Sequence, residues 1–448
     1  MGRLFGTDGV RGKAGVFPLD VTTVRRLGAA LARALRQGSQ PVRFLAGRDT
    51  RESGSWIERE LAFGVASQGG TLTSAGIIPT PAVAYLTPRT GYTAGVVISA
   101  SHNPFEDNGI KVFSGAGEKF TEALEQQVEA IVADGSWTLP PGEAGEVEQV
   151  DQRSGYVSHL LEILPQPLRS KQLRIVIDCG NGATTTVAPR VFEELGLHTL
   201  RIGVDPDGRN INLGCGSTAP QLLARTVASS GYDLGIAYDG DGDRAIFVDA
   251  NGSIVDGDAV MLMCAKQMKA EGRLTGDAIV ATVMSNIGLE IALREAGIGL
   301  VRCQVGDKYV MEEMLRRGLV LGGEQSGHVI FSEYLFTGDG LATSLNVLRT
   351  MAATGRTLAD LASDLTTYPQ VLLNLRVNQR VDLKTIPAVA AVIERVESQL
   401  AGQGRLLVRY SGTEPLLRVM LEGQEQDEIR AWGEEIIAAV KEHVGAAV

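Results

Sequence analysis

Residues 95–104 read Gly-Val-Val-Ile-Ser-Ala-Ser-His-Asn-Pro, an apolar run that stops at two serines, a histidine and a proline. Such a run, followed by turn-forming residues, is typical of a buried strand of a parallel sheet. Pro104 fixes the turn, because proline lacks the N–H group that a continuing strand would need. The stretch predicts a strand that delivers the Ser101 hydroxyl, with His102 beside it, to the edge of a sheet. Taken alone it favours an ordinary strand-to-loop turn, so its interpretation depends on the rest of the chain.

A strand, a helix and a second strand follow one another three times along the chain. These repeats cover residues 42–78, 173–204 and 278–305. Each has the hydrophobic period and the glycine or proline punctuation of a βαβ unit. Three weak repeats predict three similar mixed α/β domains.

Each repeat is followed by a strand that ends in a polar loop and by one more strand. The loops are residues 99–104 (SASHNP), 239–244 (DGDGDR) and 323–328 (GEQSGH). They occupy equivalent edges of the predicted domains. If the three domains face one central cleft, the three loops meet there.

The end of the chain does not repeat the βαβ pattern. It alternates briefly at 371–377, forms a helix at about 388–400, and ends as strand, loop, strand and helix. This pattern predicts a smaller C-terminal α+β domain. The predicted fold is thus α/β, with domains at 1–152 (serine loop), 153–256 (aspartate loop), 257–366 (glutamate loop) and 371–448.

Composition and charge exclude several classes of protein. A chain of 448 residues is too long for a single core. Its net charge of −11 argues against a nucleic-acid binder, because phosphate-backbone affinity rests on clustered Lys and Arg. No apolar stretch reaches the ~20 residues of a membrane span, and the N-terminus has no apolar leader pattern. Its 4 cysteines are far apart, which predicts buried free thiols and a cytoplasmic protein.

The most specific local signal is the run at residues 239–244. Asp239, Asp241 and Asp243 alternate with glycines, so their carboxylates can converge on one hard divalent cation. The EF-hand pattern does not fit, because arginine and alanine stand where that loop needs glycine and glutamate. A solvated acidic turn is the alternative, but the apolar strand at 234–237 favours a metal site.

Phosphate and sugar groups could bind at two further loops. No GxxxxGK[ST] motif occurs, and residues 180–185 supply only part of the dinucleotide fingerprint. An anion could instead bind near the C-terminus, where a plain β-turn is the alternative, at Arg409, Ser411, Gly412, Thr413 and Arg418. The loop at 323–328 carries donors and acceptors suited to sugar hydroxyls.

Taken together, six motifs resemble the α-D-phosphohexomutase family. They are FGTDGVRG, SASHNP, NGIK, DGDGDR, GEQSGH and RYSGTEPLLRV, in the family's order and approximate spacing over essentially the whole chain. The resemblance is closest to the bacterial members that isomerise glucosamine phosphates. It implies three α/β domains of one topology and a fourth, C-terminal domain around a central cleft.

The resemblance also implies roles for individual residues. Ser101 would be phosphorylated, and its phosphate would share one Mg²⁺ with Asp239, Asp241 and Asp243. Proton transfer and further contacts at that phosphate would fall to Arg11, His102, Lys111 and Arg244, with the general base not identified. The sugar would contact Glu324, Ser326 and His328, and the non-reacting phosphate Arg409, Ser411, Gly412, Thr413 and Arg418. The loop at 306–308 has lysine where related mutases often show arginine, so we assign it no contact.

The implied activity is the interconversion of glucosamine 6-phosphate and glucosamine 1-phosphate, on the route to UDP-N-acetylglucosamine and peptidoglycan precursors. It would run through a phosphoserine enzyme and a 1,6-bisphosphate, with Mg²⁺ as cofactor and a sugar bisphosphate as activator. The alternatives are phosphoglucomutase or phosphomannomutase activity, a Mg²⁺-dependent phosphatase, and a non-enzymatic ion-binding protein. The expected partner is a small sugar phosphate and neither nucleic acid nor a membrane; a homodimer is one state that the resemblance allows.

Overall fold

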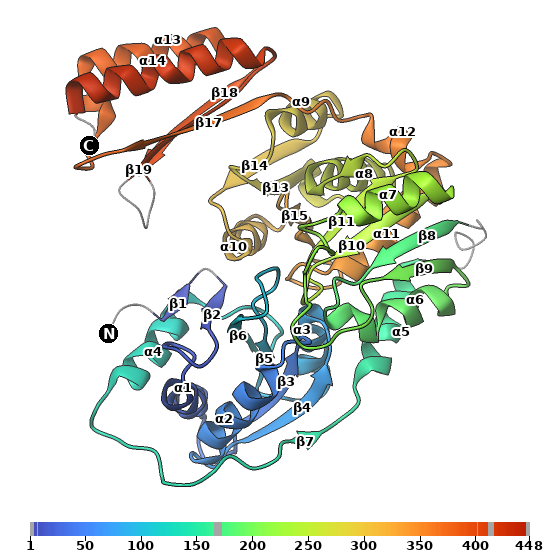
Figure 1. Cartoon of the computed structure of the whole chain (residues 1–448), viewed down its shortest axis with the longest axis vertical. Coiled ribbons are helices and arrows are strands. Elements are labelled where there is room, and N and C mark those ends of the chain that lie inside the picture. Colours follow the sequence, from blue (N-terminus) through green and yellow to red (C-terminus); the bar gives the residue numbers. More distant parts are fainter. Residues whose placement is uncertain (1–3, 7, 165–172, 401, 411–415, 445–448) are drawn as a thin grey trace. The chain divides into compact units, whose positions relative to one another are not determined.

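The computed structural model describes residues 4–6, 8–164, 173–400, 402–410 and 416–444 (Figure 1). The chain divides into two compact units. The first comprises residues 1–284 and 298–364, and the second comprises residues 285–297 and 365–448. The first unit contains three α/β domains, and the second contains the C-terminal domain.

The first domain is built on a mixed sheet with the strand order β1-β2-β6-β5-β3-β4-β7. Its strands are β1 (Phe5–Gly6), β2 (Gly9–Lys13), β3 (Arg43–Arg48), β4 (Thr71–Ile77), β5 (Ala94–Ile98), β6 (Asp107–Ser114) and β7 (Glu148–Gln149). Its helices are α1 (Val21–Ala34), α2 (Gly54–Ala66), α3 (Thr80–Arg89) and α4 (Glu122–Ala133). Strand β5 is buried at every residue and pairs in parallel with β3 and antiparallel with β6. The buried strand predicted just before Ser99 is confirmed.

The second and third domains repeat this plan with smaller sheets, in the orders β12-β11-β10-β8-β9 and β14-β13-β15-β16. The second contains α5 (Arg153–Ile163), β8 (Arg174–Asp178), α6 (Ala188–Glu194), β9 (His198–Ile202), α7 (Gln221–Ser230), β10 (Leu234–Tyr238), β11 (Ala245–Asp249) and β12 (Ile254–Val255). The third contains α8 (Gly257–Ala270), β13 (Ala278–Thr282), β14 (Gly299–Cys303), α10 (Asp307–Arg317), β15 (Leu321–Gly323), β16 (Val329–Phe331), α11 (Gly340–Thr354) and α12 (Leu358–Ala362).

Each of the three sheets carries one polar loop between two antiparallel neighbours. The loops join β5 to β6, β10 to β11, and β15 to β16. The preceding strand also pairs in parallel with a strand of the βαβ unit in each domain. The predicted repeat, and the fold of three α/β domains with a C-terminal domain, are therefore confirmed.

The second unit is an antiparallel sheet covered by helices. Its strand order is β17-β19-β18, with β17 (Gln370–Arg376), β18 (Arg405–Tyr410) and β19 (Leu416–Glu422). Helices α13 (Pro387–Leu400) and α14 (Gln426–Val444) pack side by side on this sheet (Figure 1). Helix α9 (Ile287–Glu295), which follows β13 in the chain, also groups with this unit.

The cysteines and the helices of the structure bear on two of the sequence predictions. Cys179, Cys215, Cys264 and Cys303 are all buried free thiols, as the spacing predicts. Among the described residues, no helix is long and apolar enough to cross a membrane.

Helices α1 and α2 touch backbone to backbone at two glycines. A Cβ atom at Gly64 would lie 2.0 Å from the carbonyl oxygen of Arg25, and one at Gly28 would lie 2.2 Å from that of Leu61. No rotamer change can relieve such a contact, because both obstacles are backbone atoms. The two helices can only separate.

We predict that Gly64→Ala destabilises the first domain by about 1–3 kcal/mol, the usual cost of forcing an extra methyl group into a packed interior. Urea unfolding followed by circular dichroism measures the loss. Gly145→Ala is the control, because a Cβ atom there would meet nothing within 4 Å. Equal unfolding midpoints for the two variants would contradict the close helix approach.

Candidate active site

Ser101 stands at the end of β5 in a conformation that is unusual for serine. Its φ is +53°, in the left-handed region that non-glycine residues seldom adopt, at a cost of about 1–3 kcal/mol. Its side chain is buried, and its Oγ donates a hydrogen bond to Asp239 Oδ2. The serine loop of the first domain thus meets the aspartate loop of the second.

The aspartate loop follows β10 and is also buried. One carboxylate oxygen from each of Asp239, Asp241 and Asp243 lies within 4.8 Å of the others. Gly240 lets the loop approach Ser101, since a Cβ atom there would lie 2.5 Å from the Ser101 carbonyl oxygen. The first domain also binds the aspartate loop through Thr80, at the start of α3. The Thr80 N–H donates to the Asp241 backbone carbonyl, and the Thr80 hydroxyl donates to the Asp241 carboxylate.

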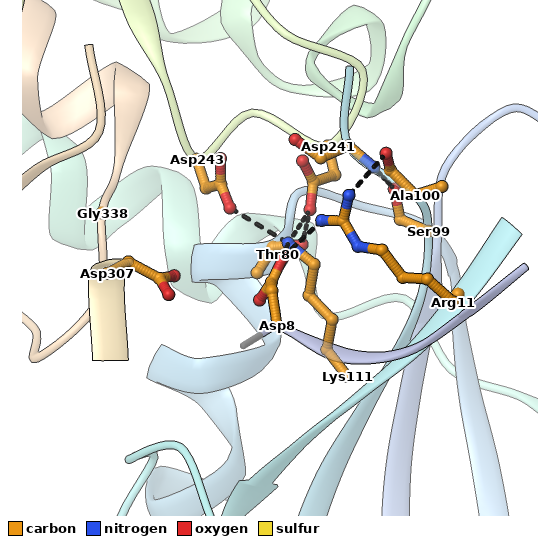
Figure 2. Close-up of polar contacts among 12 residues, drawn as sticks. Asp8, Arg11, Thr80, Ser99, Ala100, Lys111, Asp241, Asp243, Asp307 and Gly338 are labelled. Atoms are coloured by element: carbon orange, nitrogen blue, oxygen red, sulfur yellow. Dashed lines mark hydrogen bonds and ion pairs between the residues drawn. The ribbon is translucent and has the colours of Figure 1, made fainter. Parts of the chain in front are cut away.

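Lys111 on β6 lies at the centre of the buried carboxylates (Figure 2). Its Nζ is 2.8 Å from Asp241 Oδ2, 3.1 Å from Asp243 Oδ2 and 2.9 Å from Asp8 Oδ2. Burial alone would lower the pKa of Lys111, but Asp241, Asp243 and Asp8 outweigh it and raise the pKa well above its usual value. The lysine is therefore protonated at neutral pH.

The pKa values of Asp239 and Asp243 shift in opposite directions. Burial, Asp243 and Asp241 together raise the pKa of Asp239 well above its usual range. Burial also opposes ionisation of Asp243, but Lys111 and His328 hold its pKa well below the usual range. Asp243, which contacts Lys111, therefore ionises more readily than Asp239.

The aspartate loop has the chemistry of a divalent metal site. Within the described residues, the buried Oδ1 atoms of Asp241 and Asp243 have no hydrogen-bond partner. Carboxylate oxygens with free lone pairs are the ligands that Mg²⁺ prefers. The three aspartates, together with the Ser101 oxygen that touches Asp239, fit such an ion.

Two arginines contact residues next to Ser101 in the serine loop. Arg11 donates to the Ala100 carbonyl at 3.4 Å and to Asp8. His102 Nδ1 lies 3.4 Å from Ser101 Oγ and 3.2 Å from the Arg244 guanidinium. Burial, Arg244 and Arg11 lower the pKa of His102 to about 4, so the imidazole is neutral at pH 7.

The glutamate loop of the third domain reaches the same place. His328 is buried; its Nε2 accepts from the Gly338 N–H at 3.0 Å, and its Nδ1 lies 3.6 Å from Asp243 Oδ1. Glu324 Oε1 accepts from the Gly306 N–H at 3.1 Å. Ser326 is exposed, and Gln325 donates to Asp256 Oδ2 at 3.1 Å. The three polar loops therefore meet within the first unit, as the sequence predicts.

A pocket of about 570 Å³ opens beside this cluster. That volume is in the range of small-molecule binding sites. Its walls come from the first, second and third domains: Leu4, Phe5, Gly6, Asp8, Gly9, Arg11, His102, Asp243, Arg244, Val305, Gly306, Asp307, Glu324 and His328. Both cationic and anionic side chains line it, which suits a phosphorylated, hydroxyl-rich ligand.

The predicted C-terminal anion site lies in the second unit. Arg409 on β18 and Arg418 on β19 are directly opposite each other in the antiparallel ladder. Side chains at such paired positions share one face of a sheet. Ser411, Gly412 and Thr413, the other predicted members of this site, lie outside the described residues.

Comparison with known proteins agrees with this architecture. Four profiles of "Phosphoglucomutase/phosphomannomutase" match: alpha/beta/alpha domain I at residues 2–138, domain II at 154–252, domain III at 256–368 and the C-terminal domain at 372–439. The chain belongs to the phosphoglucomutase/phosphomannomutase family. The resemblance seen in the six motifs is thereby confirmed.

Individual members of this family match over their full length. The chain is 46% identical to the phosphoglucosamine mutase of Geotalea daltonii, covering 99% of each chain. It is 47% identical to the phosphoglucosamine mutase of Syntrophotalea carbinolica, covering 99% of this chain and 98% of the other. A phosphoglucomutase/phosphomannomutase family protein of Burkholderia thailandensis has the same fold, with a TM-score of 0.81 at 24% identity over 99% and 98% of the two chains.

The sequence did not predict two charged residues of the site, Lys119 and Asp307. Lys119 Nζ lies 2.6 Å from Asp8 Oδ1 and also pairs with Asp307. The glycine-rich FGTDGVRG motif marks Asp8, but no local signal marks Lys119 or Asp307. Lys308, to which we assigned no contact, pairs with the buried Glu125 at 2.8 Å.

Asp241→Asn should weaken Mg²⁺ binding by about tenfold or more, because it removes one of the charges that jointly attract the ion. Calorimetric titration of the protein with MgCl₂ measures the affinity. Asp249→Asn is the matched control, since Asp249 is a buried aspartate of the same domain whose carboxylate accepts the Asn251 and Ser253 N–H groups. Equal affinities for the two variants would refute the metal site.

Proposed function

We propose that this chain converts glucosamine 6-phosphate to glucosamine 1-phosphate and back, with Ser101 as the phosphoryl carrier. The observation that carries the proposal is the buried Ser101 hydroxyl, which donates a hydrogen bond to Asp239 of the aspartate loop, while Asp243 and Arg244 of the same loop line the pocket. Full-length identity of 46–47% to phosphoglucosamine mutases supports the choice of sugar.

In the proposed reaction, phospho-Ser101 gives its phosphoryl group to O1 of the sugar. The bond between phosphorus and Oγ breaks, a bond to O1 forms, and the O1 proton passes to the site. The 1,6-bisphosphate then turns round, and its 6-phosphate returns to Ser101 while O6 regains a proton. No phosphoryl group reaches water, and the enzyme ends as it began. A free sugar 1,6-bisphosphate would load Ser101 and so act as activator.

The surrounding residues supply charge and alignment, which are the main needs of phosphoryl transfer. Asp239, Asp241, Asp243 and the Ser101 oxygen would hold one Mg²⁺, which neutralises charge on the transferring group when bound. The cationic Lys111 lies 2.8 Å from Asp241, and Arg11 and Arg244 flank the pocket. Proton transfer falls to Arg11, His102, Lys111 or Arg244. His102 lies nearest to the serine, with Nδ1 3.4 Å from Ser101 Oγ, but burial, Arg244 and Arg11 disfavour its protonated form.

The remaining predicted residues complete the proposal. Glu324, Ser326 and His328 would bind sugar hydroxyls. Arg409, Ser411, Gly412, Thr413 and Arg418 would bind the phosphate that is not reacting. The cross-strand pairing of Arg409 with Arg418 supports this last assignment, because it places two cationic side chains on the same face of the sheet.

We predict that Ser101→Ala abolishes isomerisation and also stops uptake of a phosphoryl group from glucose 1,6-bisphosphate. The only group removed is one hydroxyl, so the unfolding midpoint should stay near that of the wild type. Coupled rate assays and intact-mass measurement test the two losses. Isomerisation at a near-wild-type rate would exclude Ser101 as the carrier.

Arg418→Ala should lower kcat/KM mainly through a higher KM, because the distal phosphate loses a charge-assisted contact worth about 1.5–3 kcal/mol. A smaller fall in kcat is expected as well, since remote binding energy aligns the reacting end. The control is Arg430→Ala, an exposed position of α14. An unchanged kcat/KM in Arg418→Ala would remove this arginine from the site.

A substrate panel tests the proposed function as a whole. With the activating bisphosphate supplied, glucosamine 6-phosphate should give the highest kcat/KM, glucose 6-phosphate a lower one, and mannose 6-phosphate the lowest. Discrimination through one substituent can be only ~1–3 kcal/mol, so side activity on glucose phosphates is expected. A preference for glucose or mannose would indicate phosphoglucomutase or phosphomannomutase activity. Release of inorganic phosphate without isomerisation would indicate a phosphatase.

A further inference from the structure

The strained backbone of Ser101 is held from both sides by buried hydrogen bonds. On the amide side, the Ser101 N–H donates to Ser99 Oγ at 2.9 Å. Ser99 Oγ in turn donates to a carboxylate oxygen of Asp49, and both side chains are fully buried. Since serine has one hydroxyl proton, this arrangement fixes its rotor: the proton points to Asp49 and a lone pair faces Ser101.

On the carbonyl side the partner is Arg51, which is only 1% exposed. One guanidinium nitrogen donates to the Ser101 carbonyl at 3.2 Å and to the Asn103 carbonyl at 2.5 Å. The other bonds the Asp49 carboxylate. Asn212 of the second domain donates to the same Ser101 carbonyl at 2.9 Å.

Asp49 joins the two sides. It accepts from the Ser99 hydroxyl, from the Arg51 guanidinium, and from the Arg51 N–H at 3.0 Å. Burial raises the pKa of Asp49, although the Arg51 charge and the Ser99 hydrogen bond oppose this shift. Asp49, Ser99 and Arg51 are buried, and their side-chain bonds go to one another and to the serine loop, so they act on the reaction through the position of Ser101.

We propose that Ser99, Arg51 and Asp49 are positioning residues that hold Ser101 in its left-handed conformation and thereby aim Oγ into the phosphoryl-transfer site. This inference rests on the proposed role of Ser101 as phosphoryl carrier. A serine released from these bonds would relax to an ordinary backbone conformation, and its Oγ would leave Asp239. Misplacement of a reacting atom by about 1 Å can cost about a hundredfold in rate.

The first domain contains a close structural match to Ser99 that lies away from the site. Ser74 on β4 is fully buried, its Oγ donates to Glu58 Oε1, and it accepts the N–H of Gly76, two residues later, at 3.0 Å. Ser99 makes the same pair of bonds, to Asp49 and to the N–H of Ser101. Removing either hydroxyl should therefore cost similar stability, which makes Ser74→Ala a matched control.

The test is the single-turnover transfer of a phosphoryl group from glucose 1,6-bisphosphate to dephosphorylated protein, followed by intact mass. In this step Ser101 Oγ bonds to phosphorus, the bond from phosphorus to the sugar oxygen breaks, and the proton lost by Oγ is balanced by the proton gained by that oxygen. Steady-state kcat and KM, and urea unfolding, are measured on the same variants.

We expect Ser99→Ala to transfer between about ten- and a hundredfold more slowly than Ser74→Ala. The two variants should have similar unfolding midpoints, and the KM for the sugar phosphate should change less than twofold. Arg51→Lys is the second variant, because lysine keeps the charge facing Asp49 but lacks the planar fork that also reaches two carbonyl groups. It should show the same loss in rate.

Transfer rates for Ser99→Ala and Arg51→Lys within twofold of Ser74→Ala, in a protein whose wild type reacts, would overturn the positioning role alone. A loss of rate that only follows a loss of stability in all three variants would overturn it too. Wild-type protein that accepts no phosphoryl group at Ser101 would overturn the proposed function and this inference with it.

Discussion

The buried cation Lys111 compensates much of the negative charge on which the site depends. Its ammonium group lies within 3.1 Å of oxygens from Asp8, Asp241 and Asp243, and all of these groups are largely removed from water. Burying a carboxylate is costly unless it is paired, and removing one partner of a buried pair leaves the other charge uncompensated. Lys111 and Asp8 belong to the first domain, and Asp241 and Asp243 belong to the second. The need to pair these buried charges therefore holds the aspartate loop of the second domain against the first domain.

The third domain joins the cluster by the same kind of contact. His328 faces Asp243 at 3.6 Å, and Asp307 pairs with Lys119, which also bonds Asp8 at 2.6 Å. Polar contacts of this kind have narrow geometric limits, whereas apolar contacts tolerate sliding. The relative position of the three loops is therefore set at the site itself, where an error would matter most for phosphoryl transfer.

The sequence predicts the strands and polar loops of the site better than it predicts the charged residues that hold those loops in place. The strands before each polar loop, the three repeats and the convergence of the aspartates all follow from local patterns, because burial and turn chemistry act over a few residues. Lys119 and Asp307 lie 188 residues apart, and nothing in the neighbourhood of either marks the other. Arg51 has the sequence of an exposed loop arginine, yet it is buried beneath the serine loop. Helix α9 belongs to the third repeat by period but groups with the C-terminal unit, since packing and not period decides that assignment.

The residues beneath the serine loop and the residues that line the pocket meet different requirements of the isomerase reaction. In the proposed reaction the bisphosphate intermediate presents first one phosphate and then the other to Ser101, so the reacting centre must stay fixed while the sugar changes orientation. Residues beneath the loop, such as Arg51 and Asp49, can be rigid because they contact only the protein. Residues facing the pocket, such as Arg11, Arg244 and Glu324, are long side chains whose charged ends can meet different oxygens of the sugar. Rigid supports beneath the serine loop, combined with adaptable side chains around the pocket, would let Ser101 react with both ends of the proposed intermediate.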